Sequence, residues 1–110
     1  MPYIKQSDRK KLDPLIDQLA GCIVARTKLQ NNDVAFAGLL NYTCTRLALQ
    51  VMRLQFGAVR YWIVAIVTGV FKNIADEFYR RIGVPYEDKQ IVKNGDVDLY
   101  QKCIDEINRM

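Results

Sequence analysis

Polar side chains that could bind a ligand gather in the middle of this 110-residue sequence. Asn41, Tyr42, Thr45 and Arg46 stand within six residues of one another. On a helix, side chains four residues apart lie about one turn apart, which pairs Asn41 with Thr45 and Tyr42 with Arg46. Such a cluster could hydrogen-bond a base or a phosphate, because a guanidinium can hold an oxyanion through two hydrogen bonds. The alternative interpretation is a polar contact between two helices.

A second cluster, Tyr79, Arg80 and Arg81, lies near the expected end of a helix. The helix dipole alone favours arginines at a carboxyl-terminal end. The same residues could instead grip an anion while the tyrosine stacks on a base. Together with Arg46, they suggest a nucleotide-like ligand held at a junction between subunits.

The third cluster comprises Tyr86, Glu87, Asp88 and Lys89. Its two carboxylates could hold Mg²⁺ with a third oxygen ligand, but adjacent helical residues point about 100° apart, which favours capping and ion pairing of a loop. Tyr86 remains a candidate ligand-binding residue. A Mg²⁺-dependent nucleotide hydrolase of the MazG type would need paired acidic motifs, Glu-Glu-x-x-Glu and Glu-x-x-Asp, and the sequence contains neither.

The amino-acid composition excludes further classes of catalytic and metal site. The chain has no histidine, which excludes Ser-His-Asp and Cys-His nucleophile systems and the common zinc sites within one subunit. Its three cysteines are far apart without CxxC spacing, so they are expected as buried or half-buried free thiols. We therefore assign no catalytic residue, no metal ligand and no cofactor, and the sequence leans towards a protein that is not an enzyme.

Charge and segment lengths indicate the kind of partner. A formal net charge of +4 permits an anionic partner without requiring one. Sequence-specific DNA binding is not favoured, because the turn at Gly57 is followed by an apolar segment over 61–71. That segment is too short for a membrane span, which needs about 20 residues. No signal-peptide pattern opens the chain, so a cytoplasmic location is expected.

The pattern of apolar residues predicts helices throughout. Asp13 and Pro14 are typical of a helix start and predict a helix to about residue 28, after a short helical turn in 1–12. Asn32 or Asp33 should cap a second helix that reaches residue 55 or 56 and ends at Gly57. Gly38 costs this helix about 1 kcal/mol, which indicates a bend or a close helix crossing.

The third predicted helix covers 59–82 and contains an uncharged segment, 61–71. A strand is the alternative there, since β-branched residues dominate, but no pairing partner is evident. The polar residues 83–96 predict only a short turn, stopped by Asn94-Gly95, before a last helix from Asp96 or Val97.

These elements predict a single all-α domain over 1–110, with four to five helices in a compact bundle around one central apolar helix. A helix that is apolar on every side needs cover on every side, and so small a bundle rarely supplies it. The surplus apolar surface predicts a homo-oligomer.

The chain also resembles a family of small uncharacterised proteins of bacteriophages and other prokaryotic sequences. The resemblance covers most of the length and rests on seven segments: Met1-Pro2-Tyr3-Ile4, Arg9-Lys10-Lys11-Leu12, Leu40-Asn41-Tyr42, Thr45-Arg46-Leu47, Glu77-Phe78-Tyr79-Arg80-Arg81, Pro85-Tyr86-Glu87-Asp88-Lys89 and Asn94-Gly95-Asp96-Val97. Leu39 stands where the family tends to carry an acidic residue. The resemblance implies no activity, and the leading hypothesis is a homo-oligomeric binding protein that sequesters or contacts a partner, such as a host protein or an anionic small molecule.

Overall fold

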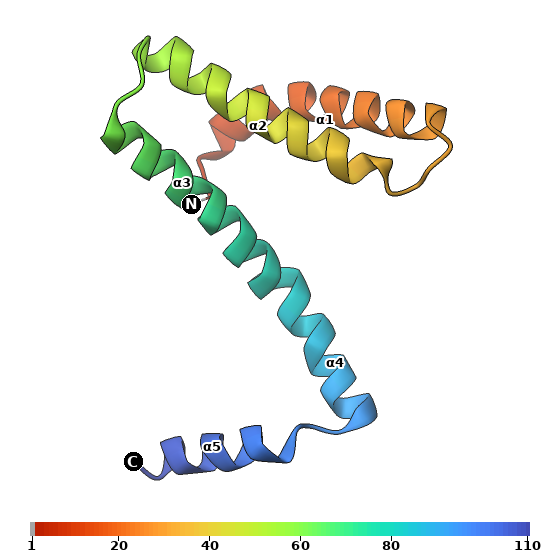
Figure 1. Ribbon diagram of the computed structural model, residues 1–110, viewed down its shortest axis with the longest axis vertical. Helices are drawn as coiled ribbons and strands as arrows, with labels where there is room; N and C mark the ends of the chain where they lie inside the picture. Colours follow the sequence, from red (N-terminus) through yellow and green to blue (C-terminus); the bar gives the residue numbers. More distant parts are fainter. Residues whose placement is uncertain (1) are drawn as a thin grey trace. The chain divides into compact units, whose positions relative to one another are not determined.

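The computed structural model describes residues 2–110, and these residues form helices joined by short turns (Figure 1). Five α-helices and one π-helical turn are present in that part of the chain, without any strand. They are α1 (Gln6–Leu29), α2 (Ala35–Phe56), α3 (Tyr61–Phe78), η1 (Tyr79–Gly83), α4 (Val84–Asn94) and α5 (Asp98–Asn108). The predicted all-α class is confirmed, and segment 61–71 is helical as expected.

The contacts within the chain divide it into two compact units. One unit ends at Val70 and contains α1, α2 and the first half of α3. The other runs from Phe71 to Met110 and contains the rest of α3, η1, α4 and α5. The interpretation of residues 1–110 as one domain stays a prediction.

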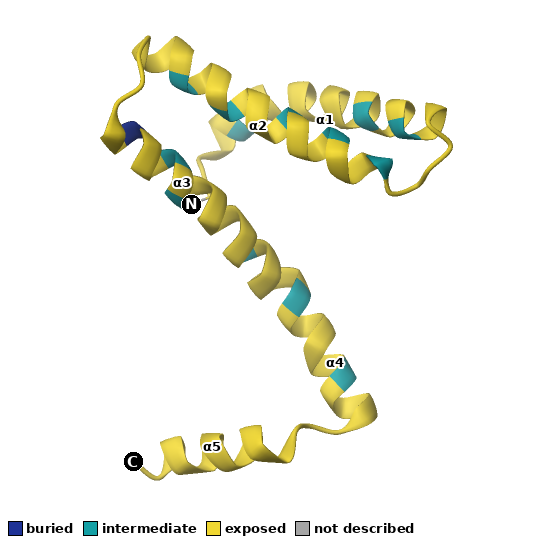
Figure 2. Ribbon diagram, viewed as in Figure 1, coloured by how far each residue is buried: buried dark blue, intermediate teal, exposed yellow. Residues whose placement is uncertain are grey.

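Helices α1 and α2 form a hairpin and pack against each other (Figure 1). In the turn between them, Asn31 takes a left-handed conformation with φ 53°. The side-chain oxygen of Asn32 accepts a hydrogen bond of 3.1 Å from the Val34 amide within this turn. The predicted cap by Asn32 or Asp33 is wrong, because Val34 is the residue before α2 and no side chain caps the helix. The half-buried residues of the hairpin, coloured teal in Figure 2, include Ile23, Thr27, Ala35, Leu39 and Thr43.

The predicted start of the first helix at Pro14 is wrong. Helix α1 begins at Gln6 and continues through Pro14 as an interior residue. Proline's fixed φ is already close to the helical value, although it cannot donate the hydrogen bond that the Lys10 carbonyl would accept. The polar residues before Pro14 therefore extend the helix by two turns, where the sequence indicated only a short separate turn.

Gly57 terminates α2 as the sequence predicted. Its φ is 75°, in the left-handed region, and its amide donates a 2.9 Å hydrogen bond to the carbonyl of Arg53. Just beyond, the rings of Phe56 and Trp62 meet edge to face, with centroids 5.1 Å apart and planes at 82°. This aromatic pair packs the end of α2 against the beginning of α3.

The expected central apolar helix is not confirmed. Among residues 2–110 only Ile63 of α3 is buried, with 2% of its surface exposed (Figure 2). Its neighbours on the same helix remain open, with Tyr61 87%, Trp62 50% and Ile66 58% exposed. Its apolar sequence therefore does not make α3 a core helix, since Ile63 is the one residue of α3 that is buried. Judged by length and apolarity, none of the helices between residues 2 and 110 is suited to crossing a membrane.

The predicted end of the third helix at Gly83 is also wrong. The backbone of Gly83 is helical, with φ −66°, and the chain passes through η1 directly into α4. Pro85 sits in the first turn of α4, where its missing amide costs no hydrogen bond. Gly95, with φ 86°, ends α4 and donates a 2.8 Å bond to Ile91, and α5 starts within two residues of its expected position.

Candidate functional site

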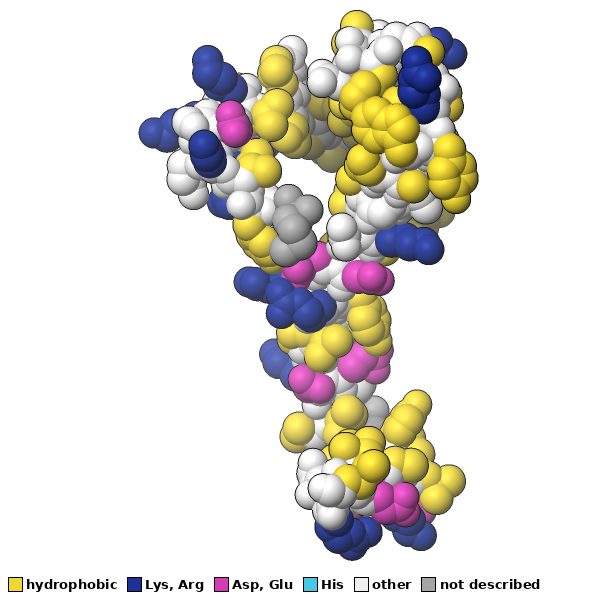
Figure 3. Space-filling view, turned by 90° about the vertical axis from the view of Figure 1, so that its left-hand side faces the viewer, with side chains coloured by type: hydrophobic (Ala, Val, Ile, Leu, Met, Phe, Trp, Pro, Cys, Tyr) yellow, Lys and Arg dark blue, Asp and Glu magenta, His cyan; other side chains and the backbone are white. Residues whose placement is uncertain are grey.

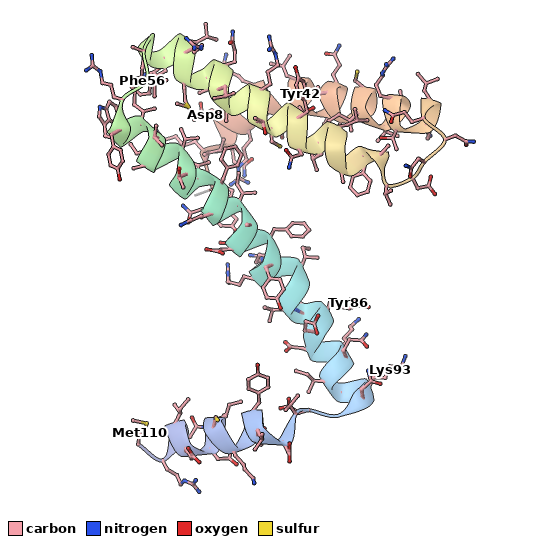
Figure 4. The ribbon with its side chains drawn as sticks, in the orientation of Figure 1. Asp8, Tyr42, Phe56, Tyr86, Lys93 and Met110 are labelled. Atoms are coloured by element: carbon pink, nitrogen blue, oxygen red, sulfur yellow. The ribbon has the colours of Figure 1, made fainter. Side chains whose placement is uncertain are left out.

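The first predicted cluster lies on one side of α2, around Tyr42 in the middle of the helix (Figure 4). A shallow, open depression is lined by Ala37, Gly38, Asn41, Tyr42 and Thr45. Their spacing of one, three, one and three residues keeps all five on one face of a helix. Three of the four predicted residues are therefore brought together, while Arg46 is exposed and does not line the depression.

Hydrogen bonding fixes one side chain of this face. The Thr45 hydroxyl donates a 2.7 Å hydrogen bond to the Asn41 carbonyl, one turn back. Its oxygen can still accept a bond from outside the helix. Tyr42 is 64% exposed, and so its ring stands out from the helix surface beside the depression. The face thus offers a hydroxyl acceptor, an amide and an aromatic ring to a partner.

Ala37 and Gly38 were not among the predicted ligand-binding residues, although they form the floor of the depression. The sequence did contain a signal for them, because small residues at i, i+1, i+4 and i+8 leave a groove along a helix. The sequence had identified Gly38 only as an unfavourable residue inside this helix. Its predicted close crossing is absent within the chain, since a Cβ placed there meets no atom within 4 Å.

The second cluster occupies the π-helical turn η1, which lies in the other unit. Arg80 is committed to a neighbour: its Nε donates a 2.8 Å hydrogen bond to Glu77 Oε1, and its Nη2 pairs with the same oxygen. It is the one ion pair among residues 2–110. The helix-dipole explanation for Arg80 and Arg81 is wrong, because the helix does not end there but continues into α4.

Tyr79 is held close to the backbone of Gly83, one turn further along. A Cβ on Gly83 would lie 2.7 Å from Tyr79 Cε2 and closer still to Cδ2. Gly83 therefore makes room for the ring, and the pair belongs to a π-helical turn, a feature that is frequent at functional sites. Arg81 is exposed on the same turn.

The third cluster lies on a helix and not in the loop that the sequence predicted. Tyr86, Glu87, Asp88 and Lys89 all belong to α4, and Tyr86 is 63% exposed (Figure 4). Glu87 stands in the first turn, where the helix dipole favours a carboxylate. No group of three or more histidine, cysteine or acidic side chains that could hold a metal ion occurs within the described part of the chain.

The prediction of buried cysteines is wrong. Cys22, Cys44 and Cys103 are free thiols, and each is exposed. The sequence placed them next to apolar residues, which normally indicates burial. The apolar faces of these helices are themselves uncovered within one chain, so the thiols on them are open as well.

The fold and the candidate sites define a small all-α protein whose first unit contains a helical hairpin. A family model described as a domain of unknown function (DUF6899) matches residues 1–97. The chain belongs to this family, and α5, from Asp98, lies beyond the matched part. No curated protein and no solved structure matches the chain.

Proposed function

We propose that this chain is a cytoplasmic, homo-oligomeric helical binding protein of phage or mobile-element origin, which acts by sequestering or contacting a partner and performs no catalysis. One observation carries the proposal: between residues 2 and 110, Ile63 is the only buried side chain. A chain with half of its residues hydrophobic does not form a stable fold around a single core residue. Other copies of the chain supply the missing cover.

Exposed apolar side chains support the same conclusion. Large hydrophobic residues stay exposed in both units, for example Leu47 and Leu54 in the first and Ile82 and Leu99 in the second. Figure 3 shows many hydrophobic side chains at the surface of the molecule. This much apolar surface is typical of a subunit and not of an independent protein.

Helix α3 offers the most apolar of these surfaces. Trp62, Ile66 and Val70 follow one another at intervals of four residues and form a stripe, and Val70 is 46% exposed. No charged side chain occurs between Tyr61 and Phe71. We propose that a neighbouring copy covers this stripe.

Light scattering of the purified protein tests the oligomer. We expect a mass of at least two chains at micromolar concentration. A strict monomer across the accessible concentration range would overturn the proposal, since the α3 stripe would then be open to water. Mass spectrometry of proteins that copurify with the native oligomer then tests its binding role. Recovery of the oligomer alone, with no reproducible partner, would contradict sequestration.

A nucleotide-like anion at a subunit junction is the second candidate. The observation in its favour is the η1 turn, where exposed Tyr79 and Arg81 stand two residues apart while Arg80, between them, is already paired with Glu77. A ligand at about 100 times its dissociation constant adds about 2.7 kcal/mol to stability. Thermal melting with a panel of nucleotides should therefore show a rise that Arg81→Ala removes. The absence of any shift would contradict this candidate.

A further inference from the structure

The depression on α2 lies on a helix face that the hairpin leaves uncovered. The half-buried residues of α2 are Ala35, Leu39, Thr43, Ala48 and Met52, and α2 packs against α1. The residues that line the depression are instead exposed along its length. None of the five lining residues is charged, and the floor of the depression consists of Ala37 and Gly38. Arg46 lies one turn beyond Tyr42, outside the lining. A second helix can approach such a floor closely, because little side chain stands in its way.

Gly38 has no explanation within its own chain. A glycine inside a helix lowers the helix-forming equilibrium about fivefold relative to alanine. Its φ is not positive, and a Cβ at this position meets nothing within 4 Å, so neither backbone conformation nor packing within the chain requires glycine. Gly21 and Gly69 are equally open, so what distinguishes Gly38 is its place in the floor of the depression.

The face is complementary to itself. Its amide, Asn41, carries both a donor and an acceptor, so two copies of Asn41 can hydrogen-bond to each other. Tyr42 projects beside the hollow over Gly38, one helical turn away, and thus one face holds both a knob and a hole. The absence of charge on the lining avoids repulsion between identical copies. A two-fold symmetric dimer requires this kind of surface, since the same patch must meet itself.

We infer that α2 of a second copy of this chain docks antiparallel across the depression, with Tyr42 of each copy over Gly38 of the other. This pairing places Asn41 of both copies within one residue of the two-fold axis. The inference rests on the proposed homo-oligomer and names a surface for it on α2, separate from the α3 stripe.

A leucine in place of Gly38 tests the contact. Leucine forms helices better than glycine and meets open space within the chain, so Gly38→Leu keeps the subunit folded. It fills the hollow that Tyr42 of the partner needs, and we expect the dissociation constant of the dimer to rise at least about tenfold. Gly21→Leu on α1 is the matched control, because its Cβ also meets nothing within 4 Å and it lies outside the depression. Equal dissociation constants for both variants, measured by sedimentation, would overturn the inference.

Disulfide trapping gives an independent readout. With Cys22, Cys44 and Cys103 replaced by serine, Asn41→Cys should form a covalent dimer rapidly under mild oxidation, since a disulfide needs Cα atoms within about 7 Å. Gln50→Cys is the control, because nine residues further along α2 its side chain points to the opposite side. If the protein is dimeric but Asn41→Cys cross-links no faster than Gln50→Cys, this surface is wrong and the proposed function stands. If the protein is monomeric, both this α2 surface and the proposed homo-oligomer are wrong.

Discussion

At the scale of single residues, glycines differ in what surrounds them, and Gly83 is the most constrained. We expect Gly83→Ala to lack the gain of about 1 kcal/mol that alanine normally brings inside a helix, because the new methyl group displaces the Tyr79 ring. Urea unfolding of Gly83→Ala, Tyr79→Ala and the double variant measures the coupling, which should be about 1 kcal/mol. Additive effects would show that the ring and Gly83 are independent.

Gly57 differs from Gly83, because its φ of 75° is in the left-handed region, which favours glycine. We expect Gly57→Ala to lower the free energy of unfolding by about 1 kcal/mol, since a Cβ is strained in that conformation. Urea unfolding measures the loss. The control is Gly21→Ala, a helical position where a Cβ meets nothing within 4 Å, and it should raise stability instead. A change of the same sign in both variants would contradict this account of the α2 terminus.

At the scale of elements, α3 provides the clearest test of the apolar stripe. We expect Ile66→Lys to weaken association at least about tenfold, because it places a charge in the surface that a second copy covers. Ala65→Lys is the control, because it adds the same charge one residue away. Ala65 lies on the side of α3 that carries Lys72 two turns later, so this variant should leave association unchanged. Light scattering of dilution series compares the two. Equal weakening by both would mean that charge, and not position, is responsible.

The sequence predicted the class of each element better than its ends. Gly57 and Gly95 were recognisable as stops, because glycine at a helix end relieves the strain of a left-handed residue. Gly83 is also a glycine but stays helical and lies against the Tyr79 ring, whereas Gly95 follows Asn94 and takes a left-handed φ of 86°. Pro14 failed in a similar way, since a proline that is typical of a first turn is tolerated inside a long exposed helix.

The candidate site was predictable in part for the same reason. Spacing on a helix is a local property, so the sequence could place Asn41, Tyr42 and Thr45 on one face of α2. The pair of Glu77 and Arg80 is equally local, since three residues separate its members, and it was missed. The sequence could not show that the cysteines are exposed, because exposure depends on what covers each helix. An apolar pattern in the sequence indicates that a surface is buried. It does not indicate whether the same chain or another copy buries that surface.

At the scale of the whole molecule, folding and assembly should be one process. Because a chain with one buried side chain gains little by folding alone, the oligomer is the stable species and its unfolding depends on concentration. For a dimer, we expect the apparent free energy of unfolding to rise by about 1.4 kcal/mol for each tenfold increase in protein concentration. Urea unfolding followed by circular dichroism over a hundredfold concentration range measures this slope. Ile66→Lys should unfold at lower urea at every concentration, since its association is weaker. A midpoint that does not move with concentration would mean that each chain is stable by itself, and the exposed faces of α2 and α3 would then have no part in holding the fold together.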